Sequence, residues 1–210
     1  MELVVGGRRL ERRLQDVEDL LSAYRTDDGL RYLDYESATP TERLVPDDLA
    51  VTILINSRAT GRAFKSVQDH GAEVDLAALP DRPLEETGTE ERDAVADVIA
   101  RVANWAGFGA SIATKVLHKK RPALIPILDN EAIFGSYMNP KWPAERARRD
   151  TVKGRSRIRE ALEWIAVDLT RPENHDAWLR LNKLEPGRSR IELFDMIWWT
   201  HFRRLQPVRG

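Results

Sequence analysis

The sequence predicts an all-α protein, and three observations support this prediction. Apolar residues recur at helical spacing along most of the chain, proline and glycine separate these stretches, and strand-like runs are scarce. Leu3-Val4-Val5, directly before Gly6-Gly7, is the only short run in the sequence that resembles a strand. The 210 residues contain no solenoid repeat, so we expect a single unit of two helical lobes.

The starts of the helices can be read from acidic and capping residues. Asp47 and Asp48 after Pro46 open one segment, Thr89 opens another, and Ser189 caps the last one. After each start, apolar side chains are spaced so that they share one buried face. These side chains are, in chain order, Leu49, Ile53, Leu54, Phe64 and Val67; Val95, Val98, Ile99 and Val102; Ile158, Ala161, Leu162, Ile165, Ala166 and Leu169; Phe194, Ile197, Trp198, Phe202 and Leu205.

The composition excludes several kinds of site. The chain has no cysteine, which excludes disulfides, thiolate zinc sites and cysteine-held iron–sulfur clusters. Its four histidines show no ligand spacing, so we expect no metal. Hydrophobic residues make up 42% of the chain, enough for a folded core. Since no segment has the length of a signal sequence or a membrane span, we expect a cytoplasmic protein without a membrane partner. We also expect a monomer.

The net charge of −1 conceals a division of charge along the chain. Residues 1–100 carry 12 Lys and Arg against 22 Asp and Glu, whereas residues 101–210 carry 21 against 12. Such asymmetry is typical of a protein with one face that meets a polyanion. The alternative is a helical protein whose two halves neutralise each other, and the charges alone do not decide between the two.

Residues 105–130 combine a glycine turn with a proline-rich loop that ends in an acid. We expect a helix to end near Trp105, Gly107-Phe108-Gly109 to form a tight turn, and a second helix to begin at Ala110. The two glycines permit positive φ and the close approach of a phosphate, which the N–H groups of the new helix also attract. Taken alone, the turn is more typical of an ordinary helical corner, because a single Gly-x-Gly between helices is common.

The residues after the turn extend the pattern. Pro122 and Pro126 stiffen the loop, and Asp129 stands 22 residues after Gly107. The segment resembles the helix-hairpin-helix, proline-rich loop and aspartate motif of the endonuclease III and alkyladenine glycosylase superfamily. This resemblance implies a two-lobed DNA glycosylase fold, double-stranded DNA as partner, no cofactor other than a monovalent cation at the hairpin, and Asp129 as the catalytic carboxylate. Asp129 is also a good N-cap for the next helix, and capping alone is the alternative role.

A carboxylate at position 129 suits the excision of a base. Cleavage of an N-glycosidic bond develops positive charge on the sugar, and a carboxylate about 4 Å away stabilises it by roughly 4 kcal/mol at an effective dielectric constant near 20. The same carboxylate can orient the attacking water. The base must leave the duplex and stack on aromatic groups. Candidates for this base pocket, each of which could instead belong to the core, are Trp105, Tyr137, Trp198 and Trp199.

The hairpin also bears on whether the strand is cut. In bifunctional members of the superfamily, a lysine at the fifth position of the hairpin attacks the sugar. Counted from Gly107, that position is Ser111. The resemblance therefore implies a monofunctional glycosylase that leaves an abasic site. Lys115, one helical turn further on, is a reserve nucleophile or a phosphate contact.

Basic residues predict further contacts with DNA. Lys119-Lys120-Arg121 and the basic segment 141–159 would neutralise phosphates. Residues 54–60 resemble the superfamily's helix-to-loop segment, in which a glutamine fills the space left by the extruded base. Arg58 occupies that position, where it could fill the same space or be an ordinary surface arginine. The other residues expected to contact DNA are Gly107, Phe108, Gly109, Ser111 and Lys115.

The chain as a whole also resembles an uncharacterised actinobacterial domain family, through residues 119–129 and 193–198. That resemblance implies no activity. We expect a nucleoid-associated enzyme that excises a damaged or enzymatically modified base. A glycosylated pyrimidine of phage DNA is one target, which would serve antiviral defence and requires a roomy, polar-rimmed pocket. The alternatives are a non-catalytic helix-hairpin-helix DNA-binding module and a helical protein-interaction domain.

Overall fold

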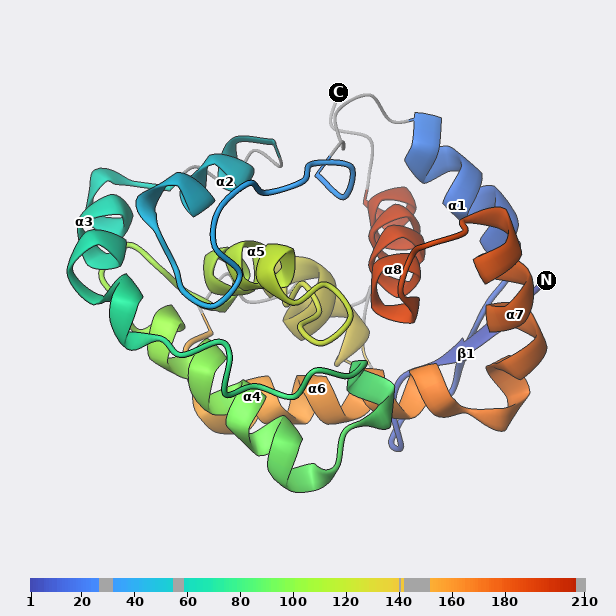
Figure 1. The fold of residues 1–210 in the computed structure, drawn as a ribbon. Helices are drawn as coiled ribbons and strands as arrows, with labels where there is room; N and C mark the ends of the chain where they lie inside the picture. Colours follow the sequence, from blue (N-terminus) through green and yellow to red (C-terminus); the bar gives the residue numbers. More distant parts are fainter. Residues whose placement is uncertain (27–31, 55–58, 140, 142–151, 207–210) are drawn as a thin grey trace.

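The computed structural model describes residues 1–26, 32–54, 59–139, 141 and 152–206. These residues are mostly helical with one small sheet, which confirms the predicted all-α class (Figure 1). Helices named η are short 3₁₀ helices, except η4, which is a π-helix. The elements are β1 (Leu3–Val5), β2 (Arg12–Leu14), α1 (Val17–Thr26), η1 (Pro46–Ala50), α2 (Val51–Leu54), α3 (Gly61–His70), η2 (Gly71–Glu73), η3 (Leu84–Glu86), α4 (Thr89–Ala103), α5 (Ala110–Lys120), η4 (Asn130–Tyr137), α6 (Arg155–Thr170), η5 (Pro172–Asn174), α7 (His175–Leu184) and α8 (Arg190–Leu205).

Local capping starts α4 and α8 where the sequence predicts them. Ser189 Oγ accepts the backbone N–H of Glu192 at 3.2 Å, and the Glu192 carboxylate accepts the Ser189 N–H at 2.9 Å. Gly88 takes the cap position before α4. The apolar faces expected for α4, α6 and α8 are buried, except that Val98 is partly exposed and Leu205 is exposed.

Helix α5 lies at the centre of the molecule (Figure 1). Helix α4 packs against both α5 and α6, and α1 packs along α8. The first and last helices of the described chain therefore share one side of the protein. Nearly every residue of α5 from Ala113 to Lys120 is buried. Among the described residues, no helix has the length and apolar character needed to cross a membrane.

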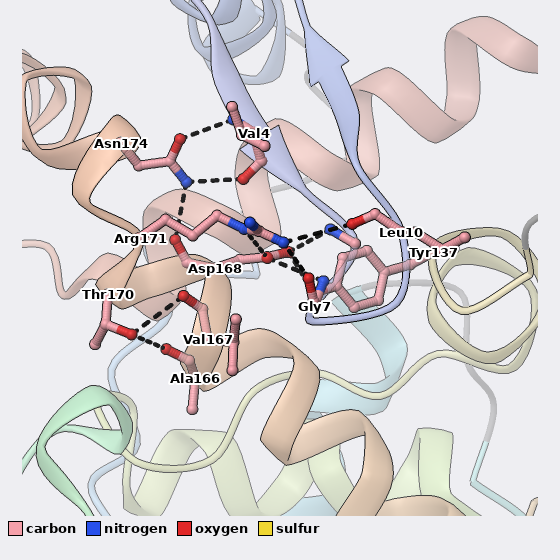
Figure 2. Close-up of polar contacts among 11 residues, drawn as sticks. Val4, Gly7, Leu10, Tyr137, Ala166, Val167, Asp168, Thr170, Arg171 and Asn174 are labelled. Carbon is pink, nitrogen blue, oxygen red and sulfur yellow. Dashed lines mark hydrogen bonds and ion pairs between the residues drawn. The ribbon is translucent and has the colours of Figure 1, made fainter.

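The predicted strand-like run forms one half of a β-hairpin, which the sequence analysis did not predict. Leu3–Val5 pairs antiparallel with Arg12–Leu14. The N–H groups of the two glycines after β1 donate to Asp168 of α6 at 2.6 and 3.0 Å, and Asn174 bonds to both backbone groups of Val4 (Figure 2). Because these buried polar groups satisfy one another, they fix the hairpin on α6 and η5.

The helical segment expected from Asp47 onward is divided into η1, α2 and α3. Thr60 has extended backbone angles, φ −89° and ψ 163°, and takes the cap position before α3, so one helical period cannot continue across it. Ile53, Leu54 and Phe64, which were expected on a buried face, are 75%, 37% and 45% exposed. That part of the predicted core is wrong, because short helices with separate axes do not share one apolar stripe.

Candidate functional site

The predicted hairpin joins α4 to α5 through residues 104–109. Gly107 has φ of +85°, a left-handed conformation that favours glycine, whereas Gly109 has φ of −175° and is extended. A Cβ atom on Gly107 would lie 2.7 Å from both the backbone N of Ala63 and the Oγ1 of Thr60. The start of α3 therefore makes a close approach at Gly107.

Two more groups of the hairpin are used inside the protein. The backbone N–H of Ala110, the first in α5, donates to the carbonyl of Val152 at 2.8 Å. Phe108 is buried and packs edge-on against Trp105, with ring centroids 5.6 Å apart. The side chain of Phe108 therefore belongs to the core, and only its backbone is left for the predicted contact with DNA.

The loop that leads to Asp129 is held by two helices. His118 and Thr114 of α5 bond to backbone groups of the loop at 2.7 and 2.9 Å. Asp195 of α8 accepts the N–H of Ile127 at 3.2 Å. Since three buried or half-buried side chains bind its backbone, the loop presents Asp129 in a fixed position.

Asp129 caps η4, as the sequence predicts. Its Oδ1 accepts the backbone N–H groups of Glu131 and Ala132 at 2.9 and 3.1 Å. Its Oδ2 accepts the hydroxyl of Ser111 at 3.1 Å and lies 3.4 Å from the Nζ of Lys115. Ser111 and Lys115 are one turn apart on α5, so the second helix of the hairpin brings both side chains to one carboxylate.

This environment keeps Asp129 ionised at neutral pH. Burial raises the pKa of Asp129, but the charge of Lys115, the two backbone N–H bonds and the Ser111 bond outweigh it, so that the pKa lies below its ordinary value. The side chain is 20% exposed and is therefore open on one side. Fixed charge of this kind stabilises a positive charge that develops beside it.

The helix after Asp129 is a π-helix, not the α-helix that its capping residue suggests. The carbonyl of Ala132 accepts the Nε1–H of Trp198 at 2.8 Å, and Arg12 donates to the carbonyls of Ser136 and Tyr137. These outside donors satisfy carbonyls near both ends of η4. π-Helical geometry is rare, and where it occurs it often marks a functional site. The geometry of η4 therefore directs attention to Asp129, which caps it.

A cavity of about 60 Å³ opens beside Asp129. Besides Asp129, its acidic and basic lining groups are Lys115 and Asp195. The other lining residues are aliphatic or aromatic: Tyr24, Tyr32, Leu33, Ile127, Ala132, Ile133, Trp198 and Trp199. A cavity with this volume and lining lacks the roomy, polar rim that a glycosylated pyrimidine requires.

Two of the four aromatic candidates, Trp198 and Trp199, line the cavity. Tyr137 is fully buried and donates to Asp168 at 2.6 Å, so it belongs to the core (Figure 2). Trp105 packs on Phe108 and does not line the cavity. The polar and aromatic lining residues that sequence reasoning missed are Tyr24, Tyr32 and Asp195.

Residues 119–121 do not form an exposed basic patch. Lys120 is 3% exposed, and its Nζ lies 2.7 Å from the Oδ1 of Asp48. Arg121 donates to a backbone carbonyl at 2.8 Å. The Nζ of Lys119 lies 4.3 Å from the ring centroid of Tyr32, and burial lowers the pKa of Lys119 to about 8. The predicted phosphate contact of Lys120 is corrected here, because its side chain is buried in an ion pair. Lys119 and Arg121 are half-buried, and their contacts with DNA stay predictions.

The basic segment 141–159 is described at residue 141 and from residue 152 onward. Arg155 and Arg159 pair with Asp97 and Asp93 of α4. Basic residues of the second half of the chain therefore neutralise acids of the first half. For the described residues, these pairs favour the alternative in which the charge asymmetry is internal.

Some predicted contacts concern residues outside the described ranges. Arg58 and residues 142–151 are among them, and their contacts with DNA stay predictions, as does the monovalent cation at the hairpin. Within the part of the chain that the structure describes, no three His, Asp or Glu side chains gather where they could hold a metal ion.

Comparison with known proteins identifies one family. A model described as a family of unknown function (DUF6308) matches residues 17–202, which include the hairpin, Asp129 and the cavity. No curated protein and no solved structure matches the chain. Because the match covers more than half of the sequence, the chain belongs to the family of unknown function DUF6308.

Proposed function

We propose that this protein is a monofunctional DNA glycosylase that excises a base from double-stranded DNA and leaves an abasic site. The observation that carries the proposal is the arrangement at Asp129. An ionised carboxylate is fixed at the start of η4 and lines an aromatic cavity beside the second helix of a glycine hairpin. The order of hairpin, proline loop and aspartate, which resembles the helix-hairpin-helix glycosylases, supports the same assignment.

Asp129 would stabilise the sugar as the glycosidic bond breaks. Two backbone N–H groups and Ser111 hold its position, and Lys115 favours its charged form. At about 4 Å and an effective dielectric constant near 20, the carboxylate contributes roughly 4 kcal/mol, or about a thousandfold in rate. It can also accept a hydrogen bond from the water that attacks C1′.

The extruded base would stack in the cavity between α1, η4 and α8. The cavity volume of about 60 Å³ is smaller than the roughly 150 Å³ of a cavity that holds benzene. The half-buried rings of Tyr24 and Trp199 would therefore have to turn aside to admit a base. A plain or slightly altered base suits this site better than one that carries a sugar.

The start of α3 supplies groups suited to contact DNA beside the hairpin. Thr60 and Ala63 lie against Gly107, so α3 begins next to the glycine turn. Arg62 and Phe64 are exposed on α3 and offer a cation for a phosphate and an aromatic ring for a base step.

The test of the proposal is the substitution Asp129→Asn. Asparagine keeps an oxygen that can accept the N–H groups of Glu131 and Ala132 but carries no charge. We expect base release from a panel of duplexes with deaminated, oxidised or alkylated bases to fall about a thousandfold, since roughly 4 kcal/mol is lost. Duplex affinity should stay within a few-fold of wild type.

The matched control is Asp176→Asn, which removes a carboxylate from the exposed first turn of α7 and should not alter release. A rate for Asp129→Asn within tenfold of wild type would remove Asp129 from the reaction. Duplex binding without release by the wild-type protein would favour the non-catalytic DNA-binding module. Failure of both binding and release would favour a protein-interaction domain.

A further inference from the structure

The cavity holds a second carboxyl group, that of Asp195. Asp195, Trp198 and Trp199 lie at positions i, i+3 and i+4 of α8, so they share one face of the helix, and all three line the cavity. The residue is 8% exposed. Asp129 and Asp195 therefore reach one small space from two different elements.

The two carboxyl groups have opposite surroundings. Asp129 has Lys115, Ser111 and two backbone N–H groups as partners. For Asp195, the described residues supply one hydrogen bond, from the backbone N–H of Ile127 at 3.2 Å, and no cation. A buried carboxyl without a cation favours its protonated form.

The charge near Asp195 also favours the protonated form of its carboxyl group. Burial raises the pKa of Asp195 well above its ordinary range; the bond from Ile127 opposes this rise, and the charge of Glu192 adds to it. The pKa of Asp129 is lowered. One cavity thus holds a carboxyl group whose surroundings favour the charged form and another whose surroundings favour the protonated form, and environments that separate two pKa values in this way mark an acid and base pair.

We propose that Asp195 is the general acid that protonates the departing base, and that the excised base is one that is uncharged in DNA. The inference rests on the proposed glycosylase function and names its substrate class. An uncharged base leaves as a poor, anionic leaving group unless it receives a proton. A base alkylated on a ring nitrogen is already cationic and leaves as a neutral molecule.

The atoms of the step balance as follows. The bond between C1′ and the base nitrogen breaks, and its electron pair stays with the base. The carboxylic acid of Asp195 gives its proton to the base, which leaves neutral. Water adds through oxygen to C1′ and gives one proton to Asp129. Exchange with solvent restores the carboxylate of Asp129 and the acid of Asp195, so that each cycle consumes one water.

The substitution Asp195→Asn separates this role from a purely positioning one. Asparagine can still accept the N–H of Ile127 and hold the loop, but it has no proton to transfer. We expect release of an uncharged base such as uracil or hypoxanthine to fall by at least a hundredfold. Release of 7-methylguanine, a cationic base in DNA, should change less than threefold. Asp176→Asn serves as the control.

The pH profile of kcat/KM gives a second readout. Wild type should lose activity as pH rises through the raised pKa of Asp195, and the variant should lack this alkaline limb. The other ionisable groups that line the cavity or act on Asp195 stay in place in the variant; they are Tyr24, Tyr32, Lys115, Asp129 and Glu192.

Equal losses for charged and uncharged bases, or an alkaline limb that persists in Asp195→Asn, would overturn the proposal and leave Asp195 as a positioning residue. In that case Asp129→Asn would still lower release about a thousandfold, so the glycosylase function would stand. If Asp195→Asn does not fold, wild type is tested with duplexes of 5-substituted uracils. A rate nearly independent of the leaving-group pKa supports a general acid, and a steep dependence contradicts it.

Discussion

Replacing Lys120 by methionine removes one charge from a buried ion pair and leaves the other charge behind. The side chains of Lys120 and Asp48 are 1% and 2% exposed, and the Nζ of Lys120 lies 2.7 Å from the Oδ1 of Asp48. The same Nζ donates to the hydroxyl of Thr39 at 2.5 Å and to the carbonyl of Pro40 at 2.6 Å. Methionine fills a similar volume but satisfies none of these three oxygens.

The expected loss of stability is about 4 kcal/mol, because breaking a buried pair from one side strands a charge in the interior at a cost of roughly 3–5 kcal/mol. For a protein of this size, that loss lowers Tm by roughly 8–16 °C. Urea unfolding followed by circular dichroism measures the free energy. Lys65→Met is the control: Lys65 forms an ion pair with Asp69 but is 67% exposed, so its loss should cost less than about 1 kcal/mol.

A double variant completes the test. Asp48→Asn keeps an acceptor for the N–H of Val45 and removes the stranded charge, so adding it to Lys120→Met should recover part of the lost stability. Loss of less than 1 kcal/mol in the single variant would refute the structural role of Lys120. So would a stable Lys120→Met protein with reduced duplex affinity, which would restore the phosphate contact that the sequence suggested.

Two further predictions concern acid stability and strand cleavage. Burial lowers the pKa of His118 from 6.5 to about 4. Between pH 6.5 and pH 4 the unfolded chain therefore takes up a proton that the folded protein does not. The free energy of unfolding should fall by about 3 kcal/mol as the pH drops through this range. Urea unfolding of His118→Gln should lack that part of the pH dependence, and an unchanged dependence would refute the assignment. Borohydride treatment during turnover should trap no covalent adduct, because Ser111 cannot form a Schiff base and Lys115 is engaged by Asp129. A trapped species that disappears in Lys115→Ala would instead make the enzyme bifunctional.

The sequence by itself determined the features that depend on a few neighbouring residues. The cap at Ser189, the cap at Asp129 and the left-handed turn at Gly107 all follow from local bonding and local backbone geometry. The buried faces of α4, α6 and α8 follow from helical spacing, since each helix has one axis and one core to face.

Tertiary structure decided what each side chain meets. A run of cations such as residues 119–121 is normally a solvated surface, but here α5 lies at the centre of the fold and Lys120 meets Asp48 from a distant segment. Asp195 gave no signal in the sequence, because a lone aspartate on a helix acquires a function only through what packs around it. The packing of α1 on α8 and the loop before Asp129 enclose Asp195 in the cavity. This enclosure removes water from Asp195, whereas Asp129 has Lys115 as a cationic partner, and both surroundings are properties of the folded chain alone.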